Sequence, residues 1–351
     1  MAAFHSIIGL LTLVLFSFCT SRATSDSYHS KPEQPDSLQT PDTLTYTAET
    51  SPEDEDDPNE LPEIKLEKEL LYDKYTLEDS YTYGKTQREF QWEKIKERLA
   101  LLESYQRKRH HWGILSNYKN MNGQAQLVKG FKRNQYGRTA DTLGVERYQG
   151  VPFYALTDTL QPVIYGRDGN LVRILTQQPT NGSFLHIQTV YPEMKEWLVP
   201  KRYVKSIGDT VKFEKAIFVD RHNQNITTLE KSVDKWLIRS MNPATTGRFR
   251  PPYAQHTPLG LFVVQAKKSK MVYLKDGSNE VGGFAPYANR FTNGAYIHGV
   301  PVVAPGTELI EYSYSLGTTP RSHMCVRNAT SHSKFIYNWG SINKTIVFVL
   351  E

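Results

Sequence analysis

Cysteine is scarce in this sequence of 351 residues. It has only Cys19 and Cys325, and Cys19 lies in an apolar stretch close to the N-terminus. Two such cysteines cannot build a disulfide framework. The sequence also lacks metal-ligand spacing, a phosphate-binding loop and a dinucleotide-binding fingerprint. We therefore expect a function that needs neither a metal nor an organic cofactor.

Long hydrophobic runs are equally rare. The apolar run at residues 7–18 is too short to span a membrane comfortably. Such a run is typical of a secretory signal, although no Lys or Arg precedes it. Residues 1–23 are thus predicted to be a signal peptide that is cleaved after Ala23. Alternatively, Cys19 is a lipidated N-terminal cysteine. Either outcome predicts an exported protein of the periplasm or cell envelope, anchored to a membrane in the second case.

Large apolar residues are almost absent from residues 24–62, which are rich in Ser, Thr, Pro, Asp and Glu. Such a segment cannot bury enough surface to offset its ordering entropy, so a disordered acidic tether is predicted. Residues 24–63 carry 12 acidic side chains and one Lys. The whole chain is +5 and Arg22 precedes this stretch, so residues 64–351 carry +15. Outside a cell, anionic wall polymers and membrane surfaces are the expected partners, and nucleic acid is not.

Residues 63–112 carry a helical pattern. Trp92, Ile95, Leu99 and Leu102 form one apolar stripe on a charged background. Gly84 is expected to separate a first short helix from this one. The stripe favours a helix that packs on the downstream domains over a coiled coil that binds a partner.

Residues 113–206 are predicted to form a small β module with an irregular lead-in. Five short β-runs, separated by Gly, Pro, Asp and Asn, begin at Phe153, Val163, Leu171, Phe184 and Glu196. The closing stretch at residues 196–204 resembles the last strand of bacterial SH3-like modules. That resemblance implies either binding of wall peptides or packing against a catalytic domain, and a simple spacer is equally compatible.

The chemistry-bearing residues gather near the C-terminus. Cys325 has His323 and Arg327 as close neighbours, and His298 lies upstream. Cationic neighbours favour the thiolate, which is the nucleophilic form of cysteine. A helix predicted to begin just after Cys325 would direct its positive end at the sulfur.

These residues carry a family resemblance. Ile-His-Gly at 297–299 and Arg-Ser-His-Met-Cys-Val-Arg at 321–327 resemble the signature of the L,D-transpeptidase catalytic domain family. A hairpin predicted from residues 216–220 and 226–230 also follows that family's order. The implied architecture is mainly β with a helical N-terminal part. A small SH3-like β-barrel would precede a β-sandwich-like L,D-transpeptidase catalytic domain at residues 207–351.

The resemblance implies a thioester mechanism on peptidoglycan stem peptides. Cys325 would attack the third residue of a tetrapeptide, and a second stem would supply an amine to form a 3→3 cross-link. His298 would be the proton acceptor, and the backbone carbonyl of Gly299 would orient its imidazole. The residues implied to line the site or supply the oxyanion donors are Tyr296, Ser322, His323, Met324 and Arg327.

Two features depart from the family pattern. Met324 stands where a glycine usually precedes the cysteine, so a positive φ there would be strained. The segment between His298 and Ser322 is longer than usual and includes a β-like run at residues 309–314. We expect that run to form a wall or lid over the cleft.

Two other functions are compatible with the sequence. The same fold and nucleophile could pass the acyl group to water, which would make the protein an L,D-carboxypeptidase. Alternatively, the site could be inactive, and the chain would then bind the wall through its SH3-like and helical parts. The choice between transfer and hydrolysis depends on water exclusion and acceptor binding, which the sequence does not display.

Overall fold

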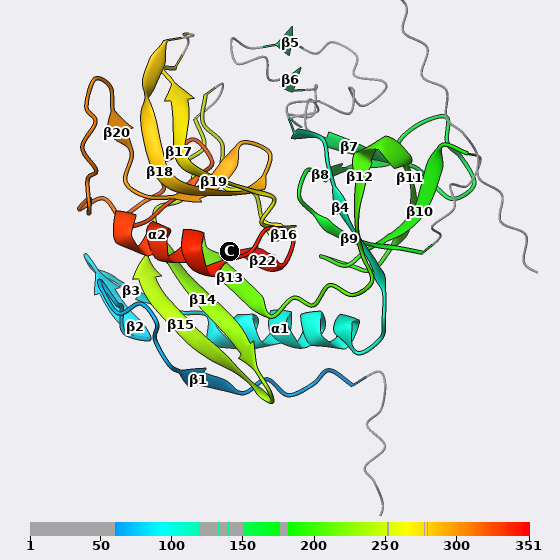
Figure 1. Cartoon of the computed structure of the whole chain (residues 1–351), viewed down its shortest axis with the longest axis horizontal. Coiled ribbons are helices and arrows are strands. Elements are labelled where there is room, and N and C mark those ends of the chain that lie inside the picture. The colour runs from blue at the N-terminus through cyan, green and yellow to red at the C-terminus, as the bar shows by residue number, and fades with distance from the viewer. Residues whose placement is uncertain are drawn as a thin grey trace, which may run out of the picture. The chain divides into compact units, whose positions relative to one another are not determined.

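The computed structural model describes residues 60–118, 150–175, 182–250, 253–276, 278 and 280–351, and only the backbone of residues 132–133 and 139–140. The predicted signal peptide, Cys19 and the tether up to residue 59 lie outside the described residues. Within them, two α-helices, α1 (Trp92–Gln106) and α2 (Thr330–Trp339), accompany many strands (Figure 1). The mainly β fold class is thus confirmed. Neither helix in the described part combines the length and apolar character that a membrane crossing requires.

A six-stranded sheet forms the first layer of the C-terminal half. Its strands, in spatial order, are β1 (Leu66–Lys68), β15 (Lys235–Pro243), β14 (Asn225–Ser232), β13 (Lys215–Asp220), β22 (Thr345–Leu350) and β16 (Gly260–Val263). β13 and β14 are the predicted hairpin, paired antiparallel. The last strand of the chain, β22, pairs in parallel with β13, so residues far apart in sequence share the centre of this sheet.

A second sheet packs on the first. It consists of β17 (Ala266–Leu274), β18 (Val281–Thr292), β19 (Ala295–His298) and β21 (Val326–Arg327), with β20 (Val302–Val303) paired to β18. Ile217 and Val347 of the first sheet share a buried apolar cluster with Ile297 and Val326 of the second, and Ile336 of α2 joins it. Burying both apolar faces against each other is what holds the β-sandwich-like arrangement together.

The helix predicted before residue 92 is absent, and this part of the prediction is wrong. Residues 63–91 instead contain β1 and the hairpin of β2 (Ser80–Tyr83) and β3 (Thr86–Glu89). Gly84 adopts a φ of +61° in the hairpin turn, a conformation that glycine accepts without strain. β1 is extended because it pairs in parallel with β15, a tertiary contact that overrides local helical preference.

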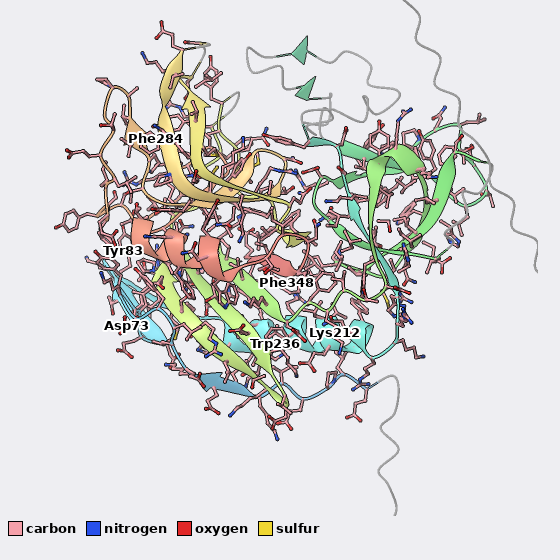
Figure 2. The ribbon with its side chains drawn as sticks, in the orientation of Figure 1. Asp73, Tyr83, Lys212, Trp236, Phe284 and Phe348 are labelled. Atoms are coloured by element: carbon pink, nitrogen blue, oxygen red, sulfur yellow. The ribbon has the colours of Figure 1, made fainter. Side chains whose placement is uncertain are left out.

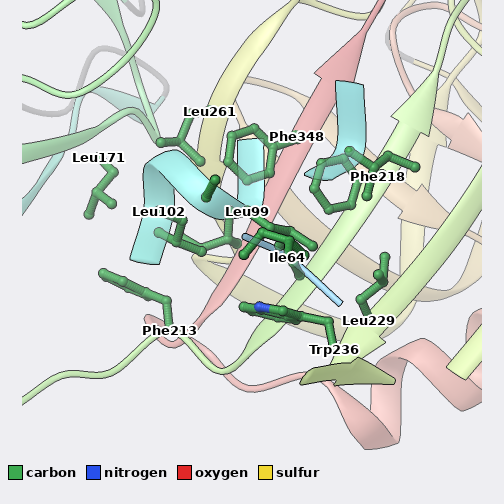
Figure 3. Close-up of a cluster of buried hydrophobic side chains, with 14 of the residues drawn as sticks. Ile64, Leu99, Leu102, Leu171, Phe213, Phe218, Leu229, Trp236, Leu261 and Phe348 are labelled. Atoms are coloured by element: carbon green, nitrogen blue, oxygen red, sulfur yellow. The ribbon is translucent and has the colours of Figure 1, made fainter. Parts of the chain in front are cut away.

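Helix α1 itself is confirmed, and its apolar stripe covers the outer face of the first sheet. Leu99 and Leu102 are buried in one cluster with Trp236, Phe218 and Phe348. The rings of Phe218 and Phe348 stack with centroids 4.9 Å apart, and Figure 3 shows the leucines of α1 beside them. In Figure 2, Trp236 and Phe348 lie near α1, whereas Phe284 lies out on β18. The stripe therefore packs on the downstream sheet, as predicted.

The upstream β module contains a five-stranded sheet. Its order is β11 (Glu196–Pro200), β10 (Phe184–Thr189), β9 (Leu171–Ile174), β4 (His111–Leu115) and β12 (Val204–Gly208), which follows the short 3₁₀ helix η3 (Lys201–Tyr203). β7 (Gly150–Phe153) pairs with β8 (Ile164–Arg167), and β5 (Lys132–Arg133) pairs with β6 (Thr139–Ala140). All five predicted β-runs overlap strands, while β4 starts where the helix was expected to end. The SH3-like character of the module remains a prediction.

One buried carboxylate joins the module to the second sheet. Asp168, which is fully buried after β8, accepts a hydrogen bond from Arg290 of β18 at 2.5 Å. It also accepts bonds from the Gln265 side chain at 3.0 Å and from the Asn293 amide at 3.1 Å. Its other oxygen accepts a hydrogen bond of 2.9 Å from the backbone amide of Asn117, which belongs to the module. This junction ends beside the turn between β18 and β19, which borders the site described next.

Candidate active site

The pairing of β19 with β21 places the predicted histidine and cysteine on adjacent segments. Ile297 is opposite Val326 in this parallel pair, and both side chains enter the apolar cluster between the sheets. Side chains alternate between the two faces of a strand. His298 and Cys325 therefore lie on the opposite face of neighbouring strands, although 26 positions separate them in the sequence.

The imidazole of His298 is held in one tautomer. Its Nδ1 lies 2.6 Å from the carbonyl oxygen of Gly299, which can only accept, so Nδ1 carries the proton and donates it. Nε2 is then the nitrogen with the lone pair. Burial is the main cause that lowers the pKa of His298 to about 4, with the Gly299 bond opposing this shift and the positive charge of Arg327 adding to it. At neutral pH this side chain is an uncharged base.

Cys325 is partly exposed at the end of the loop before β21. Its Sγ donates a long hydrogen bond of 3.7 Å to the carbonyl of Gly294, in the turn between β18 and β19. The guanidinium of Arg327 interacts electrostatically with the cysteine. A cation beside the sulfur favours the thiolate, and solvent access leaves it open to an electrophile.

The loop that carries the nucleophile is tightly tied down. Met324 has a φ of +141° and is buried. The hydroxyl of Thr257 donates to the Met324 carbonyl at 2.9 Å. Ser322 Oγ accepts from the Met324 amide at 3.3 Å and donates to the Cys325 carbonyl. Of the two amides predicted to bind an oxyanion, that of Met324 is therefore already directed at Ser322, which makes the Cys325 amide the better candidate.

The φ of Met324 gives a stability prediction. A non-glycine residue in this region carries roughly 1–3 kcal/mol of backbone strain, but the buried methionine also contributes packing to the core between the sheets. We expect Met324→Ala to be destabilised, because the strain stays and the packing is lost. Met324→Gly should be more stable than Met324→Ala by about 1 kcal/mol, although glycine is the smaller residue. Urea unfolding of both variants measures this difference, and an alanine variant as stable as the glycine variant would show that no strain is stored.

The first amides of the helix after Cys325 do not stabilise its sulfur as predicted. α2 begins at Thr330, after β21, and its first amides are already taken. The Thr330 amide donates to the Glu311 carbonyl at 2.8 Å, and the Ser331 amide donates to the Glu311 carboxylate at 3.1 Å. A carboxylate at this position satisfies both the unpaired amides and the helix dipole. The expectation that α2 activates Cys325 is therefore wrong.

Residues 309–314 do not form the predicted β-like run. They are irregular, and Glu311 ties them to the start of α2. Most of their side chains are exposed, and Tyr314 is 96% exposed. The predicted wall or lid is therefore an anchored irregular segment, and the physical reason is that its polar groups bond to a helix end rather than to a strand.

Two predicted lining residues lie at the edges of the site. His323 is exposed, and its Nε2 lies 3.1 Å from the Asp276 carboxylate in the connection between β17 and β18. Tyr296 is buried, and its hydroxyl meets that of Tyr118 at 3.2 Å. Burial and the tyrosine neighbour raise the pKa of Tyr296. It therefore stays neutral behind the nucleophile, where it interacts electrostatically with Cys325.

Sequence reasoning missed two further arginines, which border the site. Arg248 and Arg321 both interact electrostatically with Arg327. Arg321 begins the motif that ends at Arg327, whereas Arg248 lies far from it in the sequence. No group of three or more His, Cys, Asp and Glu side chains in the described part of the chain is arranged to hold a metal ion. The chemistry on display is thus a thiol, a neutral imidazole and guanidinium groups.

Comparison with known proteins finds a family match in the C-terminal part of the chain. A family model described as the L,D-transpeptidase catalytic domain (YkuD) matches residues 214–349. A search of curated proteins finds no match. The matched range contains the six-stranded sheet except β1, and all of the second sheet.

The chain also has similarity to solved structures, each at low identity and a low TM-score. An L,D-transpeptidase from Mycobacterium smegmatis is 18% identical, with 57% of this chain and 99% of that chain covered and a TM-score of 0.33. One from Mycobacterium tuberculosis H37Rv is 19% identical, with coverages of 53% and 92% and a TM-score of 0.33. A fused amidase, peptidase and peptidoglycan-binding protein from Clostridium acetobutylicum is 19% identical, with 39% of this chain covered and a TM-score of 0.28. The chain spans only about half, 51%, of that last protein.

Proposed function

We propose that residues 214–349, which match the L,D-transpeptidase catalytic domain model, form such a domain and that the protein is a cysteine acyltransferase acting on peptidoglycan stem peptides. Cys325 is the nucleophile, His298 the proton acceptor and Gly299 the carbonyl that orients it. One observation carries the proposal. A thiol and a neutral imidazole with a fixed tautomer share one face of paired strands in the matched domain.

The reaction follows from the positions of these groups. Nε2 of His298 takes the thiol proton, and the sulfur attacks the carbonyl carbon of the third stem residue. The developing oxyanion is stabilised by the Cys325 amide. The C–N bond then breaks, the imidazolium returns its proton to the leaving amine, and D-alanine departs. An amine of a second stem attacks the thioester, loses a proton to His298 and leaves a 3→3 cross-link with the thiol restored.

The surroundings of the site support an anionic substrate. Arg327 lies on the face of β21 that carries Cys325 and interacts with it electrostatically. A planar guanidinium can bind a carboxylate through two hydrogen bonds. We extend the proposal to an exported protein, because wall peptides lie outside the cytoplasm, with Cys19 as its lipid anchor or residues 1–23 as its cleaved leader.

Acylation of the purified protein by a carbapenem tests the nucleophile. We expect the mass of one opened carbapenem to be added to the wild-type chain and none to Cys325→Ala, because only the thiolate can open the lactam ring. Cys325→Ala should keep the wild-type melting temperature, since the side chain is small and partly exposed. Mass spectrometry of the intact protein reads the result.

Wall fragments then separate the two outcomes of the acyl-enzyme. Dimers joined 3→3 support transfer, whereas tripeptides alone support an L,D-carboxypeptidase. Absence of both adduct and turnover would contradict the proposal and favour an inactive protein that binds the wall.

A further inference from the structure

Three neighbouring backbone segments place three arginines around the nucleophile. The Thr245 amide bonds to the Arg327 carbonyl at 3.0 Å, and the Arg321 amide bonds to the Thr246 carbonyl at 2.9 Å. The Arg248 amide bonds to the Ser322 carbonyl at 3.0 Å. These bonds fix the Cα positions of Arg248, Arg321 and Arg327 on adjacent segments, so their clustering is built into the loop that carries Cys325.

The cluster has no acidic counterpart in the part of the chain that the structure describes. None of the three side chains takes part in an ion pair with a described residue. The Nε atoms of Arg248 and Arg327 are buried and find no acceptor among the described residues. Asp276, in the connection between β17 and β18, is paired with His323. Guanidinium groups that are partly removed from water without an acceptor are costly unless an anion binds there.

The cluster also differs from two other enclosed arginines, Arg239 and Arg290. Arg239 pairs with Glu69 and Glu230, and the buried Arg290 pairs with Asp168. Carboxylates therefore compensate these two enclosed guanidiniums, whereas no described carboxylate pairs with the three arginines near Cys325. An unbalanced positive charge beside a nucleophile is the arrangement that selects a negatively charged substrate.

We propose that Arg248 and Arg321 join Arg327 in binding the free α-carboxylate of the donor's leaving residue. This inference rests on the proposed function and names the feature of the donor that the site recognises. In a donor whose last residue departs, that carboxylate is within one residue, about 3.8 Å of chain, of the carbonyl that Cys325 attacks. The arginines therefore confine cleavage to the last peptide bond of a stem.

A donor without the terminal charge is the discriminating probe. In a Cys325→Ala background, which cannot turn over, calorimetry compares a stem-type tetrapeptide ending in D-alanine with its C-terminal carboxamide. The free acid should bind at least 10-fold more tightly than the amide, because only the carboxylate accepts charge-assisted bonds from the arginines. Adding Arg248→Gln or Arg321→Gln should reduce this preference to 3-fold or less.

Arg250→Gln is the matched control. Arg250 belongs to the same loop but is exposed, and it is not among the main charges that shift the pKa of Arg327, so the preference for the acid should persist in this variant. If Arg248→Gln fails to fold, Arg321→Gln still tests the inference, because Arg321 is exposed. Equal affinity for acid and amide, no measurable binding of either peptide, or a preference that survives both substitutions would overturn the inference.

Turnover separates this inference from the proposed function. A wild-type protein that binds the acid selectively but forms no acyl-enzyme refutes the proposed reaction and keeps the anion site. A wild-type protein that is acylated equally well by acid and amide keeps the reaction and refutes the role of the arginines.

Discussion

His298→Gln is expected to slow acylation of Cys325 by roughly 10²–10⁴-fold, the usual contribution of a positioned general base. Glutamine can occupy a similar volume and still donate toward the Gly299 carbonyl, but it cannot accept a proton. Stopped-flow measurement of carbapenem acylation gives the rate. His222→Gln is a suitable control, because His222 is exposed in the turn between β13 and β14 and its loss should leave the rate unchanged.

The pH profile distinguishes a base from a structural histidine. Because the pKa of His298 is lowered to about 4, the wild-type rate should decline only as the pH approaches 4. In His298→Gln the thiol must lose its proton to solvent, so the residual rate should rise with pH over the range in which the wild-type rate is flat. Parallel profiles for the two proteins would contradict the assignment of His298 as the base.

The same lowered pKa makes the fold sensitive to acid. In the unfolded chain His298 titrates near its ordinary pKa of about 6.5, whereas in the folded protein it does so at about 4. The neutral, buried imidazole therefore contributes stability that is complete above about pH 6.5 and is lost as the pH falls toward 4. The contribution is about 3 kcal/mol. The buried His332, whose pKa is lowered to about 3 by burial, adds to this acid sensitivity.

Asp168→Ala is expected to have the largest effect on stability. The substitution leaves the guanidinium of Arg290 buried without its carboxylate, at a cost of about 3–5 kcal/mol. For a chain of this size the melting temperature should fall by on the order of 10 °C. Differential scanning calorimetry measures the shift. Asp158→Ala, an exposed aspartate of the same module that caps the Leu160 amide, should cost far less.

A double substitution shows whether the cost comes from the orphaned charge. Asp168→Leu combined with Arg290→Met replaces the pair by apolar groups of similar volume, which is often neutral or stabilising. We expect it to recover most of the lost stability. A double variant as unstable as Asp168→Ala would indicate that the bonds to Asn117, Gln265 and Asn293 matter more than the charge pair.

Asp168 also has a route to the reaction. Asp168 accepts a hydrogen bond from the backbone amide of Asn293. The next residue, Gly294, accepts a hydrogen bond from the Cys325 thiol through its carbonyl. Loss of the carboxylate should therefore slow acylation as well as lower the melting temperature, whereas the double variant should restore stability more fully than rate. The upstream module thus holds the turn behind the nucleophile, whatever else it binds.

The sequence alone placed the local features of this protein. The spacing of Ile95, Leu99 and Leu102 predicted α1, because a helical stripe depends only on positions three and four apart. The short β-runs after residue 150 predicted five strands, because this pattern too depends only on residues close together in the sequence. The motif around Cys325 pointed to the family, because a nucleophile and its base need particular residue types.

Tertiary structure decided the features that depend on distant partners. β1 is a strand because β15 pairs with it, and α2 is capped by Glu311 from the inserted segment. The three arginines meet because the segments at 245–248, 321–322 and 326–327 share backbone bonds. Sequence patterns report the periodicity of one segment, whereas pairing register, capping and uncompensated charge arise between segments. That is why Cys325 and Arg327 could be singled out in the sequence, whereas the clustering of Arg248 and Arg321 with Arg327 could not.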